Sequence, residues 1–94
     1  MATNFRILID QNGIDLHLKL SGDFDGSSAH QVLNVLEQYC GNCARIFIHT
    51  NYLKRIIPFG RGVFLSNLHF LKGEPVHLIF TGKNASQLAP QRFM

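Results

Sequence analysis

The chain has 94 residues, which is enough for one small domain with a modest core, so residues 1–94 are expected to form a single domain. With 46% hydrophobic and 16% charged residues, its composition excludes an intrinsically disordered chain. The formal net charge of +3 at pH 7 gives a weak preference for anionic partners and does not by itself indicate nucleic acid. No apolar run approaches the roughly 20 residues of a membrane span, and no signal-peptide core is present, so we expect a cytoplasmic protein.

The first half of the chain is predicted to form a β-hairpin and a helix. Residues 5–9 are expected as the first strand, and Asn12-Gly13 is typical of a hairpin turn. The second strand alternates apolar and polar residues, which predicts one buried face and one solvated face. Its apolar residues are Ile14, Leu16, Leu18 and Leu20. Ser28 is expected to cap the helix that follows, together with Gln31 in a capping box.

The second half of the chain is predicted to continue as strand, helix, strand and a short tail. A third strand over residues 45–50 has a continuous apolar middle, which is typical of a central strand covered on both faces. A loop over residues 51–58 leads to a second helix over residues 60–71, and a fourth strand covers residues 76–80. Asn84 is expected to cap a last short helix. This order, a β-hairpin followed by βαβαβ, predicts an α/β fold with a mixed four-stranded sheet and both helices on one face.

The acidic turn after the second strand has two interpretations. Asp23-Phe24-Asp25-Gly26-Ser27 mimics the DxDG[ST] signature of haloacid-dehalogenase-type phosphatases, in which the first Asp is a nucleophile and the second a general acid. Such a site also needs a further acidic pair, and only Glu37 and Glu74 remain after Asp25. We therefore favour a turn whose Asp and Ser side chains cap backbone N–H groups, and we expect no catalytic residue.

The cysteines and histidines give no strong signal for a cofactor or a metal. Cys40-x-x-Cys43 could be a redox pair or half of a zinc site, but the second ligand pair of a zinc site is absent. The pair ends a helix instead of opening one, so it lacks the helix N-terminus that lowers a thiol pKa, and two reduced cysteines are expected. Five scattered histidines are expected as separate surface imidazoles: His17, His30, His49, His69 and His77.

Cations gather around the start of the second helix. Lys54, Arg55 and Arg61 flank it, while Gly60 and Gly62 leave its first backbone N–H groups uncovered. A helix N-terminus favours anions, so a small anion- or nucleotide-binding site at Gly60, Arg61 and Gly62 remains an alternative. The spacing matches neither a P-loop nor a dinucleotide fingerprint, and a solvated basic loop explains the same residues.

These segments together resemble the STAS domain family, named for sulfate transporters and anti-sigma factor antagonists. Residues 20–25, Leu-Ser-Gly-Asp-Phe-Asp, with Ser28-Ala29 are similar to the family's L-x-G-x-[LF]-D followed by a small-residue helix start. Gly60-x-Gly62 before an apolar helix also fits. The resemblance covers about residues 3–89 and implies a STAS-like domain. The family usually continues after the fourth strand with a helix, a strand and a final helix, so a truncated C-terminal part is expected.

The resemblance implies a non-catalytic module of bacterial signalling that works by protein–protein contact. Bacterial antagonists of this kind bind a protein kinase or an anti-sigma factor, and phosphorylation of a serine at the start of the second helix switches them. The family pattern there is D-S-[ST]-G-x-G. In this chain Ile57 takes the place of the acidic residue and Pro58 that of the serine, so this switch is lost.

We therefore expect a partner-binding surface with an apolar centre and a basic rim, suited to an acidic protein such as a kinase or an anti-sigma factor. Its expected residues are Asp23, Asp25, Lys54, Arg55, Ile57, Pro58, Phe59 and Arg61. Neither a membrane nor a nucleic acid is an expected partner, and no cofactor or metal is expected. Self-association into a homo-oligomer through an unpaired edge of the fourth strand is a further hypothesis.

Overall fold

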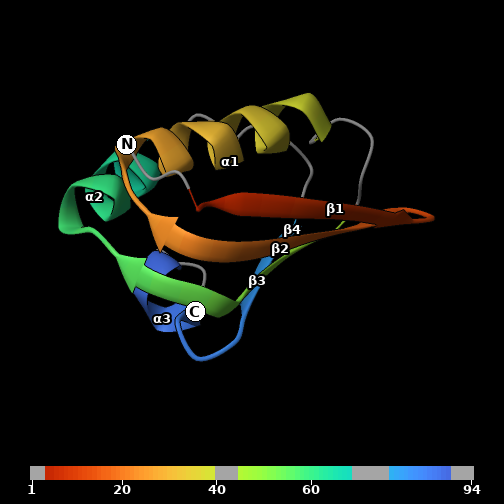
Figure 1. The fold of residues 1–94 in the computed structure, drawn as a ribbon. Coiled ribbons are helices and arrows are strands. Elements are labelled where there is room, and N and C mark those ends of the chain that lie inside the picture. The colour runs from red at the N-terminus through yellow and green to blue at the C-terminus, as the bar shows by residue number, and fades with distance from the viewer. Residues whose placement is uncertain (1–3, 40–44, 69–76, 90–94) are drawn as a thin grey trace.

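The structure, a computed structural model, describes residues 4–39, 45–68 and 77–89 (Figure 1). Its elements are β1 (Arg6–Asn12), β2 (Asp15–Phe24), α1 (Gly26–Tyr39), β3 (Arg45–Ile56), α2 (Pro58–Leu68), β4 (His77–Thr81) and α3 (Ala85–Leu88). The strand order is β1-β2-β3-β4, with β1 antiparallel to β2 and the remaining pairs parallel. The predicted α/β fold with a mixed four-stranded sheet is confirmed.

The helices α1 and α2 lie on the same side of the sheet (Figure 1), as the alternation in β2 requires. Leu16, Leu18 and Leu20 point to that side and are fully buried. Ile14 was expected beside them but is 63% exposed, because it lies in the hairpin turn next to Gly13, whose φ is 65°. No helix among the described residues is long and apolar enough to cross a membrane.

Strand β3 is longer than predicted, because its second half pairs with the end of β2. The expected loop over residues 51–58 is wrong: the strand continues to Ile56, which lies opposite Phe24. The pairing has two register shifts, between Lys19 and Ser21 and between Gly22 and Asp23, and at each of them β3 contains one more residue than β2. The expected cover on both faces is also wrong, since Phe47 and His49 are only half-buried on the face opposite the helices.

The later elements differ from the predictions mainly at their ends. Helix α2 begins at Pro58 instead of Gly60, because proline suits the first turn of a helix. Its predicted end at Leu71 lies outside the described residues. Asn84 precedes α3 but makes no side-chain capping bond; its amide instead donates to the carbonyls of Thr50 and Leu53 at 3.1 and 3.4 Å. Asn84 therefore ties α3 to β3.

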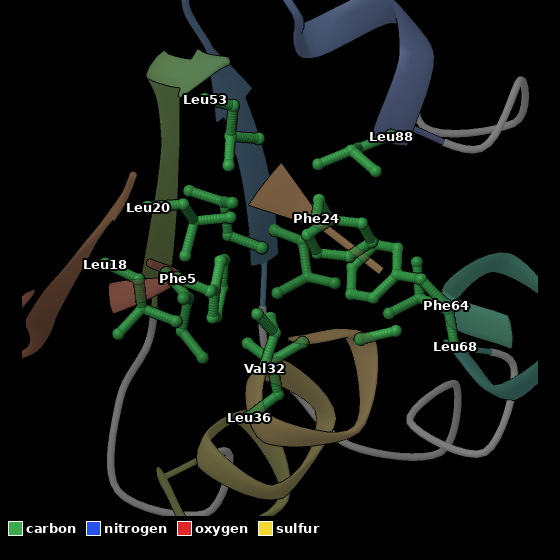
Figure 2. Close-up of a cluster of buried hydrophobic side chains, with 14 of the residues drawn as sticks. Phe5, Leu18, Leu20, Phe24, Val32, Leu36, Leu53, Phe64, Leu68 and Leu88 are labelled. Atoms are coloured by element: carbon green, nitrogen blue, oxygen red, sulfur yellow. The ribbon is translucent and has the colours of Figure 1, made fainter. Parts of the chain in front are cut away.

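The core fills the space between the sheet and the helices. Figure 2 shows Leu18 and Leu20 of the sheet meeting Val32 and Leu36 of α1. Phe24 packs edge-on against Phe64 of α2, with ring centroids 5.8 Å apart. Further edge-on contacts join Phe24 to Phe5 at 5.9 Å and Phe64 to Phe80 at 6.2 Å. These aromatic rings join both edges of the sheet to α2.

Replacing Phe64 with Ala is expected to lower the free energy of unfolding by about 3–5 kcal/mol, because a fully buried ring leaves a cavity between α2 and the sheet. Phe59→Ala in the same helix removes a ring that is 73% exposed, and it is expected to change the free energy of unfolding by about 0.5 kcal/mol or less. Urea denaturation of the two variants measures both values. Equal losses would contradict the placement of these rings.

Candidate functional site

The acidic turn after β2 organises the start of α1 through one carboxylate. Oδ1 of Asp25 accepts a hydrogen bond from the backbone N–H of Ser28 at 2.9 Å and lies 3.1 Å from the hydroxyl of Ser27. The prediction that Ser28 caps α1 is wrong: Ser28 is buried inside the first turn, and its hydroxyl lies 3.1 Å from the carbonyl of Asp23. A carboxylate at the positive end of α1 is the favourable arrangement.

The start of α2 packs directly against this turn. The N–H of Ile57 donates to the carbonyl of Phe24 at 2.8 Å. Gly60 is buried, and a Cβ at its position would lie 2.5–2.7 Å from backbone atoms of Asp25, so no larger residue fits. The ring of Phe59 lies beside Gly26, 3.0 Å from where a Cβ there would be. We call residues 23–28 with residues 57–61 the helix-start junction.

The junction presents a small apolar surface to solvent. Phe59 is 73% exposed, and Pro58 is also exposed. Ile57 is half-buried, and Ile56 packs against the core. The solvent-facing apolar group of the predicted surface is therefore Pro58 and Phe59, with part of Ile57.

The three cations of the predicted surface lie in different environments. Arg55 forms an ion pair with Asp23 on the neighbouring strand, at 3.2 Å between Nη2 and Oδ2. Nε of Arg61 donates to the carbonyl of Gln87 in α3 at 2.6 Å. Lys54 is exposed and makes no ion pair with any residue that the structure describes. No sequence pattern predicts the contact between Arg61 and Gln87, because it depends on where α3 packs.

The geometry does not favour the alternative anion site at Gly60, Arg61 and Gly62. Gly60 faces the backbone of Asp25, Gly62 is exposed, and the Arg61 guanidinium is directed at α3. Both carboxylates of the phosphatase-like motif have structural contacts: Asp23 with Arg55, and Asp25 with α1.

The residues behind the metal and redox interpretations are described only in part. Within residues 4–39, 45–68 and 77–89, no three His, Cys, Asp or Glu side chains are grouped to hold a metal ion. Cys40 and Cys43 lie outside these ranges, so the expectation that they are reduced stays a prediction.

Two histidines form a hydrogen-bonded chain across the face of the sheet opposite α1 and α2, which we call the helix-free face. Nδ1 of His17 lies 2.9 Å from Nε2 of His49, whose Nδ1 lies 2.6 Å from the hydroxyl of Thr81. His17 also stacks on Phe47, with ring centroids 4.6 Å apart. The expectation of separate surface imidazoles is wrong for this pair. Only the register between β2 and β3, which sets Lys19 opposite His49, could have revealed it.

The histidine pair makes stability depend on pH. Burial lowers the pKa of His49, and repulsion from His17 and Lys19 lowers it further. Near the ordinary histidine pKa of about 6.5, folded His49 therefore binds fewer protons than His49 of the unfolded chain does, so stability falls as the pH falls through that range. His49→Gln is expected to flatten this dependence, measured by urea denaturation across that range. His30→Gln, at an exposed position of α1, serves as the control and should leave the slope unchanged.

Comparison with known proteins identifies the fold. No family model and no curated protein matches the chain. The chain is similar to a solved structure of Mglu in its L-glutamate binding form in the presence of 4.3 M NaCl, with a TM-score of 0.72 over 89% of this chain at 14% identity. It spans only 20–28% of the length of the Mglu chains that it matches.

Two similar structures are closer to this chain in size. The anti-sigma factor antagonist SpoIIAA in its unphosphorylated form matches with a TM-score of 0.60 and 17% identity, covering 81% of this chain and 70% of that one. An uncharacterized DUF3478 family protein with a SpoIIAA-like fold, from Shewanella loihica PV-4, matches with a TM-score of 0.57 and 19% identity over 88% of this chain and 75% of that one. The chain therefore has the SpoIIAA-like, STAS-type fold.

Proposed function

We propose that this chain is a non-catalytic protein–protein interaction module that resembles an anti-sigma factor antagonist of a bacterial partner-switching system. The observation that carries the proposal is the exposed ring of Phe59, held against Gly26 at the first turn of α2. A rigid aromatic side chain at the surface is a typical anchor of protein interfaces. In the family that the sequence resembles, this turn is where partner binding is regulated.

The proposed partner is a kinase or an anti-sigma factor with an acidic surface. Lys54 has no ion-pair partner among the described residues and can meet an acidic group, and Arg55 and Arg61 are exposed although each has a contact within the chain. Positive charge at the rim of an apolar anchor speeds association with an acidic partner. Asp23 and Asp25 take part by positioning Arg55 and α1. Such a module would work in the bacterial cytoplasm.

The proposed binding is not switched by phosphate at the start of α2. No residue between Tyr52 and Ser66 carries a hydroxyl group. Ser66 is exposed, but it lies in the second half of α2, where its hydroxyl donates to the carbonyl of Val63 at 3.3 Å. We therefore propose a surface that binds its partner constitutively.

Purified anti-sigma-factor kinases and anti-sigma factors of the source organism can be titrated calorimetrically with this chain. We expect one of them to bind, and Phe59→Ala to raise its Kd about tenfold or more, because truncating an anchor costs about 2 kcal/mol. Tyr52→Ala is the matched control, since Tyr52 is also an aromatic residue with 73% exposure but lies on β3. Equal effects of the two variants, or no binding by any candidate, would contradict the proposal.

Restoring the family pattern provides an independent test. In Ile57→Asp combined with Pro58→Ser, the kinase that binds the chain is expected to add phosphate to the new serine. The wild-type chain is expected to gain none in residues 57–62, which offer no acceptor. Mass spectrometry after incubation with the kinase and ATP reads out both results. If wild-type binding weakens because another residue becomes phosphorylated, the proposed constitutive binding is wrong.

A further inference from the structure

β1 is an edge strand with exposed apolar side chains on both of its faces. Among the described segments it pairs only with β2. Leu8 is 64% exposed on the helix-free face, and Ile9 is 46% exposed on the helix side. With Ile14 they are three of the five exposed large apolar side chains of the described residues. An accessible, apolar edge of this kind favours pairing with a further strand.

The same strand carries two opposite charges that have no ion-pair partner among the described residues. Arg6 and Asp10 lie on the helix-free face with Leu8 between them. On that face Asp15 pairs with Arg45 at 2.8 Å and Asp23 pairs with Arg55, so ion pairs between neighbouring strands already form there. Arg6 and Asp10 are about 13 Å apart along the strand, too far to pair within one chain.

The backbone of β1 is also suited to a further strand. Gly13 has a positive φ and Ile14 does not, which fits a type II′ hairpin turn closed by the pair Asn12 and Asp15. Antiparallel pairs alternate in hydrogen bonding, so the N–H and C=O groups of Ile7 and Ile9 point away from β2. These groups are the donors and acceptors that a new strand would use.

We propose that the chain forms a twofold dimer in which β1 pairs antiparallel with β1 of a second copy, centred on Leu8. In this register Arg6 of each copy lies opposite Asp10 of the other, which completes two ion pairs. Leu8 meets Leu8 on the axis, and Ile7 exchanges backbone hydrogen bonds with Ile9 of the second copy. The two sheets become one eight-stranded sheet with all α1 and α2 helices on one side.

Other registers of the same strand lack this complementarity. Centring the pair on Ile7 or Ile9 places a charge of one copy opposite Leu8 of the other. Centring it on Arg6 or Asp10 places identical charges opposite each other, which is destabilising. The other edge strand, residues 77–81, contains no acidic residue and no Lys or Arg, so it offers no matching pair. The charge pattern of β1 therefore selects a single register.

A charge-swap series measured by sedimentation equilibrium tests the dimer. Wild-type protein is expected to dimerise, and Arg6→Asp or Asp10→Arg alone is expected to raise the dimer Kd about tenfold or more, since each places two pairs of like charges in contact. Arg6→Asp combined with Asp10→Arg is expected to return the Kd to within about threefold of wild type, because the opposite charges face each other again. Phe59→Ala, away from β1, is the control and should leave the dimer intact.

Several results would overturn the proposal. A wild-type chain that stays monomeric up to several hundred micromolar excludes the dimer. A dimer that neither single reversal weakens, or that the double swap does not restore, excludes this register. If Arg6 and Asp10 instead keep the edge soluble, replacing both with Ser increases self-association, and that result also counts against the proposal. Thermal unfolding followed by circular dichroism verifies that each variant is folded.

Discussion

The arrangement of the whole candidate site depends on the close approach of two backbones, where the first turn of α2 meets the turn after β2. At Gly60 this approach leaves no room for a side chain, and the bond between Ile57 N–H and the Phe24 carbonyl fixes the end of β3 at the same point. Asp25 in that turn accepts a hydrogen bond from the first turn of α1, so both helices begin at the helix-start junction. Because most of these contacts involve backbone atoms, surface residues can change while the frame persists. The solved structures compared above match the chain at 12–19% identity.

The features that could be predicted from the sequence are those in which the residue pattern of one segment indicates which of its side chains are buried and which are exposed. The alternation of β2 is of this kind, and so is the solvent exposure of Phe59 next to charged residues. Features that depend on a distant partner were missed. Residues 51–56 look like a loop, yet they form a strand because β2 supplies their hydrogen-bond partners. The His17–His49 contact and the direction of Arg61 likewise follow from strand register and from the return of α3.

Different interactions stabilise the sheet on its two faces. On the helix side, burial of apolar side chains between β2, β3 and α1 is the main contribution. On the other face, side chains from neighbouring strands pair across the two central strands. Arg45 binds Asp15 through two nitrogens at 2.8 and 2.9 Å, and the parallel rings of His17 and His49 lie 5.2 Å apart. Polar pairs on the exposed face are thus consistent with the strand register that apolar packing supports from the core.

Only Ile57 separates the end of β3 from the first residue of α2. A connection this short, bonded to the neighbouring strand, has almost no conformational freedom to lose when another molecule docks against it. Little ordering entropy then opposes association, and a modest contact area can support useful affinity. The cost is adaptability: a ligand has to match the contour that this rigid corner already has, so discrimination between ligands rests on shape instead of on rearrangement.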